Sequence, residues 1–243
     1  SSDRDVMRVA ENMIHEGADI LDVGAESTRP GSRGISDKLE IERLLPVITK
    51  LTREFKFPIS VDTYKPEVAS VVLQEGVAVI NDISGLGAGH KMAKVVSKYQ
   101  AGIVLMHMKG TPEIMQKNPS YDDVCMEVYN FLKDRIKLAE NAGINPGSIA
   151  IDPGIGFGKT IDHNFTIIQK LDQISNRGFP VLIGPSRKSF IGLTLDLPPH
   201  KRIEGTAAAV SAGILNGARI VRVHDVKEMK RVVAISEKIR TAA

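Results

Sequence analysis

The sequence predicts a parallel α/β fold, on three observations. Short runs rich in Ile and Val alternate with longer segments of helical periodicity along the 243 residues. A glycine, which adopts the left-handed helix-ending conformation easily, stands where many predicted helices end, and an apolar run starts directly after it. These runs are apolar on both faces, which is typical of strands buried in a parallel sheet.

Seven strands and eight helices are predicted. A glycine introduces six strands, in the segments EGADILDVG (16–24), EGVAVIND (75–82), AGIVLMHM (101–108), AGINPGSIAIDPG (142–154), RGFPVLIG (177–184) and NGARIVRVHD (216–225), and the seventh is FPISVDT (57–63). The first two helices follow from apolar residues that share one face, namely Val6, Val9, Ala10, Met13 and Ile14, then Leu44, Leu45, Ile48 and Leu51. Further helices are predicted near 66–75, 90–99, 121–142, 162–176, 201–216 and 226–240.

The surplus of one helix over the strands favours a (β/α)8 TIM barrel. The supplied chain opens with a helix, whereas a closed barrel needs a strand before it, so we expect that the first strand is missing from this chain. Residues 1–243 are then a single barrel domain that is incomplete at its N-terminus. The alternative is an open, doubly wound sheet.

Composition argues against several classes of protein. The formal net charge of +3 is too small to indicate a nucleic-acid or membrane partner, and the 5% aromatic content without Trp disfavours base stacking. No apolar run approaches the roughly 20 residues that span a bilayer. The one cysteine, Cys125, is interpreted as a residue packed on a helix, which fits a reducing compartment. We expect a cytoplasmic location.

Polar or charged residues follow every predicted strand. In a barrel these positions meet at one mouth, where active sites lie. Taken singly, Asp82 suits a turn cap, His107 a satisfied core histidine and Asp225 a cap for the last helix. The whole set at equivalent positions instead indicates a site; its members are Asp22, Asp62, Asn81, Asp82, His107, Asp152, Ser186, Arg187, Lys188, Arg222, His224 and Asp225.

The set divides by charge. Asp22, Asp62, Asn81 and Asp152 offer acceptors, which suit a flat heterocycle with N–H donors, or a metal. Donors come from the later strands, at Ser186, Arg187, Lys188, Arg222 and His224, and they suit phosphate or carboxylate. A site with both halves would hold a polar ring at one end and an anion at the other.

The segment GIGFGKT (154–160) only superficially resembles a P-loop, because Pro153 stands where that motif needs its first glycine. We interpret it as a loop whose backbone runs close to its neighbours after Asp152. The remaining histidines lack ligand spacing, so no zinc site is predicted.

Several segments, in this order, resemble the dihydropteroate synthase family. They are DVGAESTRPG (22–31), VDTYKPEVA (61–69), INDISG (80–85), LMHMKGTPEIMQ (105–116), DPGIGFGKT (152–160), GPSRKSFIG (184–192) and RVHDV (222–226). STRPG and SRKSFIG carry most of the discrimination. The resemblance implies a TIM-barrel transferase of folate biosynthesis that joins para-aminobenzoate to 6-hydroxymethyl-7,8-dihydropterin pyrophosphate, giving 7,8-dihydropteroate and pyrophosphate.

The resemblance also implies roles for residues. Asp62, Asp152, Lys188, Arg222 and His224 would be catalytic. The pterin would be held by Asp62, Asn81, Met106, Asp152, Phe157, Gly184 and Lys188, the pyrophosphate by Asn81, Arg222 and His224, and para-aminobenzoate by Thr28, Arg29, Pro30, Phe157, Ser186, Arg187 and Lys188. The cofactor would be Mg²⁺, with Asp22 near it and an Asn of the missing N-terminal segment as main ligand. The family also implies a homodimer and small-molecule substrates, and its members are sulfonamide targets.

Three alternatives remain. A methyltetrahydrofolate-binding barrel of corrinoid methyltransferases would share Asp62, Asn81 and Asp152 but would not need the basic half. A non-catalytic binding barrel should have a damaged basic half, whereas all five of its residues are present. A phosphate-sugar barrel enzyme would usually show a Gly-rich loop near the last strands, which NGARIVRVHDV lacks.

Overall fold

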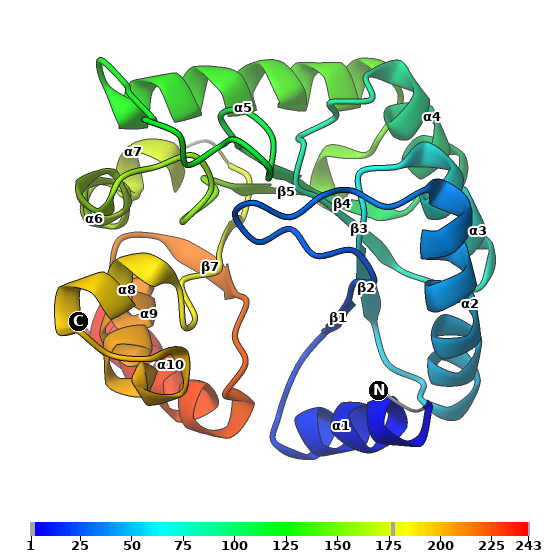
Figure 1. The fold of residues 1–243 in the computed structure, drawn as a ribbon, viewed down its shortest axis with the longest axis horizontal. Coiled ribbons are helices and arrows are strands. Elements are labelled where there is room, and N and C mark those ends of the chain that lie inside the picture. Colours follow the sequence, from blue (N-terminus) through cyan, green and yellow to red (C-terminus); the bar gives the residue numbers. More distant parts are fainter. Residues whose placement is uncertain (1–2, 176–177, 243) are drawn as a thin grey trace.

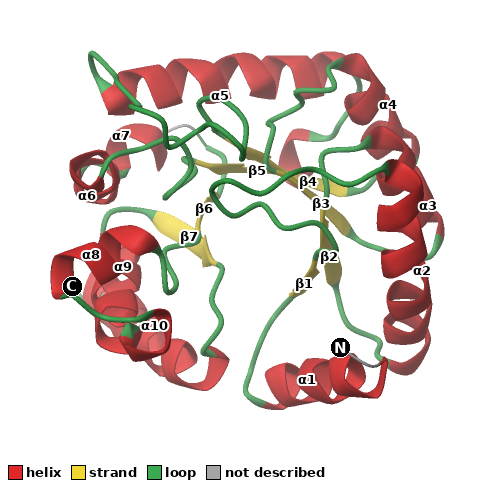
Figure 2. Ribbon diagram, in the orientation of Figure 1, coloured by secondary structure: helices red, strands yellow, loops and turns green. Residues whose placement is uncertain are grey.

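The computed structural model describes residues 3–175 and 178–242, and it shows an arc of strands at the centre with helices outside it (Figures 1 and 2). The strands are β1 (Leu21–Val23), β2 (Ile59–Asp62), β3 (Val79–Asp82), β4 (Gly102–Met106), β5 (Ile149–Asp152), β6 (Val181–Ile183) and β7 (Ala218–Val221). The helices are α1 (Asp3–His15), α2 (Asp37–Glu54), α3 (Pro66–Gln74), α4 (His90–Lys98), α5 (Val124–Asn141), α6 (Ile161–Gln169), α7 (Asp172–Ser175), α8 (Ser189–Leu195), α9 (Ile203–Leu215) and α10 (Val226–Thr241), with short 3-10 turns at Pro146–Ser148 and Pro199–Lys201.

The described strands form one parallel sheet in chain order, β1 to β7. Each strand therefore pairs with the next one along the chain. The helices that connect the strands lie outside the curved sheet, as they do in TIM barrels. The register places Asp62 opposite Asn81, and Met106 opposite Asp152, so the polar strand ends lie at the same edge. The alternative of an open sheet that reverses its strand order is wrong.

The main core lies between the strands and the surrounding helices. Leu44 and Ile48 of α2, Val72 of α3 and Val96 of α4 are almost fully buried against strand residues such as Ile80. Cys125 is buried in the same core, as predicted. A smaller group inside the curve, Val104, Ala150 and Leu182, fills the space between strands. The packed core fixes the strand ends, which is what the site requires.

Two helical predictions need correction. The helix predicted over 162–176 is broken after Gln169, because the Asn216 side chain donates to the carbonyls of Ile168 and Gln169 (2.9 and 3.2 Å) that a continuing helix would use. The predicted end at 176 lies outside the described residues. The additional helix α8 was missed, because its sequence SFIGLTL is short and contains Gly192.

The predicted glycine caps are confirmed at 17, 76, 143 and 217, where φ is positive, but not at Gly102; Gly178 also has a positive φ, but the residues directly before it lie outside the described ones. There the left-handed residue is Gln100 (φ 52°), and Gly102 is the first residue of β4. A Cβ on Gly102 would lie 3.1 Å from Val79 Cγ2, so at this position glycine gives room for a neighbouring strand and does not end the helix.

The described residues contain no helix that is long and apolar enough to cross a membrane.

Candidate active site

The acidic strand ends and Arg222, which follows β7, meet at one mouth of the sheet. Arg222 Nε donates to Asp22 Oδ2 at 2.5 Å, and its Nη2 lies 3.5 Å from Asp62 Oδ2. Asn81 Nδ2 also reaches Asp22 Oδ2, at 3.4 Å. The side chains that close this contact are separated by up to 200 positions in the sequence. The predicted convergence of acidic and basic halves is therefore present.

Three buried oxygen atoms at this mouth accept no hydrogen bond from the described residues: Asp22 Oδ1, Asp62 Oδ1 and Asn81 Oδ1. A buried acceptor without a partner costs roughly 1–3 kcal/mol, so such atoms are rare in folded proteins unless a ligand or water satisfies them. All three are acceptors, which selects a ligand rich in N–H donors or a hard cation.

Burial and the neighbouring Asp22 charge raise the pKa of Asp62 to about 7, against the lowering effect of Arg222. For Arg222 itself, burial acts to lower the pKa, but Asp22 and Asp62 outweigh it and the net pKa is raised. Arg222 thus stays charged. Asp62 has a pKa close to neutral pH, so its charge depends on what binds beside it.

A second group of charges surrounds Asp152 at the end of β5. Its carboxylate accepts the Gly154 N–H at 2.6 Å, and burial raises its pKa while the ammonium groups of Lys188 and Lys159 oppose that rise. Burial lowers the pKa of Lys188 to about 8 and that of Lys159 to about 7. Two amino groups, of buried Lys159 and half-buried Lys188, therefore interact with one buried carboxylate.

Lys188 directly precedes α8 and interacts electrostatically with Asp152 and Asp62. Its Nζ donates to the Ile155 carbonyl and stands 4.1 Å from the centre of the Phe157 ring, an arrangement that favours a cation. Met106 ends β4 and is paired with Asp152 in the sheet. Gly184 follows β6, and a Cβ placed on it would lie 3.7 Å from Arg222 Cβ. Met106, Asp152, Phe157 and Lys188, four of the residues predicted to hold the pterin, thus lie near one another.

The 154–158 turn is built by glycines with positive φ, at Gly154 (70°), Gly156 (81°) and Gly158 (62°). A Cβ on each would lie 1.9 Å from the His107 carbonyl oxygen, 2.6 Å from Lys188 Cδ and 2.5 Å from the Lys109 carbonyl oxygen, respectively. The interpretation of this segment as a close-running loop is confirmed.

Lys159, which a P-loop would turn towards phosphate, points inward. It is 3% exposed, and its Nζ lies 3.0 Å from both His107 Nδ1 and the Phe157 carbonyl oxygen. His107 is buried, as expected for a core histidine, and burial together with Lys159 lowers its pKa to about 3. Its ring is therefore neutral and can accept from the ammonium group.

The basic half after β6 and β7 is held by paired side chains. Ser186 Oγ lies 2.9 Å from His224 Nδ1 and also accepts the His224 N–H at 3.2 Å. Burial lowers the pKa of His224, and the positive charges of Arg187 and Arg222 add to this effect. Arg187 forms a two-pronged ion pair with Asp225. The expected capping of α10 by Asp225 is wrong, since its side chain makes no cap hydrogen bond.

Asp82, by contrast, has the structural role that its position suggested. Its carboxylate accepts from Ser84 N, Ser84 Oγ and Leu86 N at 2.6–2.9 Å, so it caps the turn after β3 and offers nothing to a ligand. One member of the strand-end set is thereby removed from the site.

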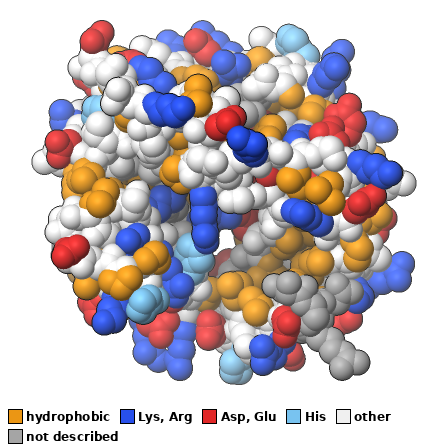
Figure 3. Space-filling model, viewed as in Figure 1, with side chains coloured by type: hydrophobic (Ala, Val, Ile, Leu, Met, Phe, Trp, Pro, Cys, Tyr) orange, Lys and Arg blue, Asp and Glu red, His pale blue; other side chains and the backbone are white. Residues whose placement is uncertain are grey.

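The loop between β1 and α2, residues 24–36, carries Thr28, Arg29 and Pro30 and crosses the centre of the strand arc in the view of Figure 1. Its Gly31 N–H donates to the Pro112 carbonyl of the β4–α5 loop at 2.9 Å. Arg29 is close enough to His224 to contribute to lowering the pKa of that histidine. In Figure 3 the same face is hollowed near its centre, with Lys or Arg and His side chains at the rim.

The sequence matches the family described as pterin binding enzyme over residues 1–224. It is 45% identical to the dihydropteroate synthase of Bacillus subtilis over 228 residues, which is 94% of this chain and 78% of that protein. The Yersinia pestis dihydropteroate synthase in a sulfonamide drug complex superposes with a TM-score of 0.95 at 36% identity, over 100% of this chain and 87% of that one. This chain belongs to the dihydropteroate synthases of the pterin-binding family.

The Burkholderia cenocepacia dihydropteroate synthase complexed with 7,8-dihydropteroate gives a TM-score of 0.92 at 38% identity, over 100% of this chain and 89% of that one. Membership of the dihydropteroate synthase family confirms the predicted transferase class and favours condensation over the methyltransferase alternative.

Sequence reasoning missed two residues that shape this dihydropteroate synthase site. Lys159 was not predicted, because its segment was compared only with a P-loop, whereas its ammonium group in fact pairs with His107. Arg202 was also missed; its Nη1 donates to the carbonyls of Arg187 and Lys188 at 2.8 and 3.2 Å and so holds the lysine-bearing turn. Its side chain crosses Gly192, where a Cβ would lie 2.0 Å from Arg202 Cζ.

Proposed function

We propose that this chain condenses para-aminobenzoate with 6-hydroxymethyl-7,8-dihydropterin pyrophosphate at the mouth formed by β1 to β7. The observation that carries this proposal is the contact of Arg222 with both Asp22 and Asp62 beside three unpartnered buried acceptors. An anion-binding group and a donor-binding group are thereby adjacent, as a pterin joined to a diphosphate requires.

Asp152, Asn81 and Asp62 would bind the polar edge of the pterin. Asp152 can accept two N–H groups of the aminopyrimidine, and each charge-assisted hydrogen bond contributes roughly 1.5–3 kcal/mol. Asn81 Oδ1 and Asp62 Oδ1 are free to accept as well. Lys188 would lie over the ring with Met106 and Phe157 as its apolar walls, since its Nζ already stands on the Phe157 face.

Arg222 and His224 would bind the pyrophosphate and stabilise the negative charge that it gains as the C–O bond breaks. Positive charge then builds on the pterin methylene, which Asp62 and Asp152 favour electrostatically. The described residues include no group of three His, Cys, Asp or Glu that could hold a metal. The free Asp22 Oδ1 nevertheless suits a partly hydrated Mg²⁺, whose chemistry when bound is to neutralise diphosphate charge.

Thr28, Arg29 and Pro30 would frame para-aminobenzoate, together with Ser186, Arg187 and Lys188. The Arg29 guanidinium is exposed and can pair with the carboxylate, whereas two N–H groups of Arg187 are already used by Asp225. The arylamine then attacks the methylene from a fixed position, so catalysis is mostly orientation and electrostatics. No covalent nucleophile is required.

The test is pyrophosphate release by the full-length protein with both substrates and Mg²⁺. We expect release that depends on para-aminobenzoate and equals the dihydropteroate formed. Methyl transfer from methyltetrahydrofolate to a corrinoid partner is measured beside it; methyl transfer without pyrophosphate release would overturn the proposal. We also propose a homodimer, which sedimentation equilibrium of the same protein would test.

A further inference from the structure

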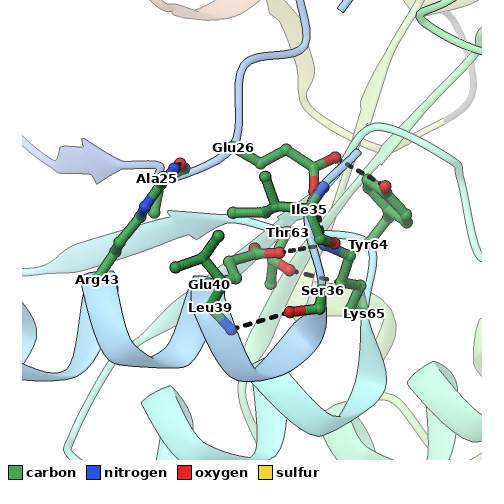
Figure 4. A network of polar contacts seen from close by, with 10 residues as sticks. All are labelled: Ala25, Glu26, Ile35, Ser36, Leu39, Glu40, Arg43, Thr63, Tyr64 and Lys65. Atoms are coloured by element: carbon green, nitrogen blue, oxygen red, sulfur yellow. Dashed lines mark hydrogen bonds and ion pairs between the residues drawn. The ribbon is translucent and has the colours of Figure 1, made fainter. Parts of the chain in front are cut away.

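A cluster of buried charges lies beneath the 24–36 loop, outside the residues assigned to substrates (Figure 4). At its centre is Lys65, which precedes α3. Lys65 Nζ donates to Glu26 Oε2 at 2.5 Å, to Glu40 Oε2 at 2.6 Å and to the Ile35 carbonyl oxygen at 2.7 Å. All three hydrogens of this ammonium group are therefore used. We call Glu26, Lys65 and Glu40, with their contacts to Ile35 and Tyr64, the Lys65 clamp.

The clamp is closed to solvent. The side chains of Lys65, Glu26 and Glu40 are 10%, 5% and 1% exposed. Burial acts to raise the pKa of Glu26, but the hydrogen bonds from Lys65, Ile35 and Tyr64 outweigh it and the net pKa is lowered. A buried carboxylate held below its ordinary pKa is one whose hydrogen bonds are well formed. The polar groups of the clamp are thus hydrogen-bonded to one another and shielded from solvent.

Glu26 ties the two ends of the loop together. Its Oε2 accepts the Ile35 N–H at 3.0 Å, while its Oε1 accepts the Tyr64 hydroxyl at 2.7 Å. Lys65 binds the same two ends, through Glu26 and the Ile35 carbonyl. The segment 27–34, with Thr28, Arg29 and Pro30, is therefore a closed loop whose base is fixed to the β2–α3 connection.

The two carboxylates of the clamp belong to different parts of the chain. Glu26 belongs to the loop, whereas Glu40 belongs to the first turn of α2, a helix anchored in the core by Leu44 and Ile48. Two carboxylates share one ammonium, so removing either one leaves a neutral Lys–Glu pair and avoids an unpaired buried charge, which would be strongly destabilising. The chain therefore offers two matched truncations, of which only one frees the loop.

We propose that Glu26 and Lys65 are positioning residues for para-aminobenzoate: they hold the base of segment 27–34 so that Thr28, Arg29 and Pro30 stay over the mouth of the site. This inference rests on the function proposed above, in which that segment frames para-aminobenzoate. Fixing a loop in its binding conformation removes its ordering cost from the binding step. Glu26 and Lys65 therefore act on the second substrate and leave the pterin unaffected, because the residues proposed to bind the pterin lie outside segment 27–34.

The test compares Glu26→Ala with Glu40→Ala in the full-length enzyme, with Glu26→Gln as the conservative variant. We expect Glu26→Ala to raise KM for para-aminobenzoate by about tenfold or more, with KM for the pterin pyrophosphate unchanged. Glu40→Ala should leave both KM values within about twofold. Glu26→Gln keeps an acceptor for Lys65 and Ile35 and should recover most of the loss. Equal effects of Glu26→Ala and Glu40→Ala would overturn the proposal.

Limited trypsin digestion gives a readout that is independent of catalysis. Arg33 is exposed in segment 27–34, whereas the Arg29–Pro30 bond resists trypsin because proline follows the arginine. Cleavage after Arg33 should accelerate in Glu26→Ala and stay at the wild-type rate in Glu40→Ala; unchanged cleavage in Glu26→Ala would show that the clamp does not hold the loop.

Arg29→Ala separates the two proposals. If it leaves KM for para-aminobenzoate unchanged, the framing role in the proposed function is wrong. If Arg29→Ala raises this KM but Glu26→Ala does not, the framing role stands and the inference about the clamp is wrong.

Discussion

Replacing Asp152 by Asn should weaken pterin binding far more than para-aminobenzoate binding. The change is nearly isosteric, but the new amide cannot satisfy both sides of the site. If its oxygen accepts the Gly154 N–H, now received by Asp152 Oδ1 at 2.6 Å, its NH₂ faces the donors of the pterin. If it flips, the buried Gly154 N–H loses its partner. Either arrangement loses a charge-assisted hydrogen bond and adds an unsatisfied group.

The expected loss is about 3 kcal/mol, or roughly a hundredfold in affinity, from one charge-assisted bond of 1.5–3 kcal/mol and one unsatisfied buried donor. Isothermal titration calorimetry with a pterin ligand, and separately with para-aminobenzoate in the presence of pyrophosphate, measures it. Asp82→Asn is the matched control, because Asp82 is also a buried strand-end aspartate but its oxygens bind only Ser84 and Leu86. An unchanged pterin affinity in Asp152→Asn would refute the assigned role.

Three further predictions concern the basic residues. Arg222→Ala should slow pyrophosphate release by roughly 10²–10³-fold, because transition-state charge loses its donor; unaltered turnover removes Arg222 from the mechanism. Pterin affinity should weaken as the pH rises through about 8, because burial lowers the pKa of Lys188 to about 8 and the ammonium is then lost; Lys188→Gln should abolish this alkaline limb of the binding profile. Lys159→Met leaves buried acceptors on Phe157 and His107 unpaired, so the melting temperature should fall by about 4–8 °C, whereas exposed Lys133→Met should change it little.

The strand–helix order and the meeting of polar strand ends at the candidate site could be predicted, because both depend on local patterns. Buried parallel strands are marked by Ile and Val on both faces, and a parallel sheet brings their carboxyl ends to one edge. Asp62 opposite Asn81, and Arg222 against Asp22, follow from that rule. Family resemblance supplied the substrate assignments.

Features that depend on contacts between distant segments could not be predicted. The break after Gln169 is caused by the amide of Asn216, which lies 47 positions away. The left-handed residue before β4 is Gln100, where glycine was expected, because the next glycine is needed beside Val79. Lys65 lies 39 positions after Glu26 and 25 positions after Glu40, and nothing local in the sequence indicates that the three share one hydrogen-bonded group.

The glycine turn after β5 restricts how this enzyme can escape an inhibitor. Each of its three missing Cβ positions is occupied by a different neighbour: the His107 carbonyl, the Lys188 stem or the Lys109 carbonyl. Any larger residue there would collide with the Lys188 side chain or with main-chain atoms that a point mutation does not remove. A compound that gains its affinity by packing against the main chain of this turn would therefore address a surface that resistance mutations can scarcely remodel.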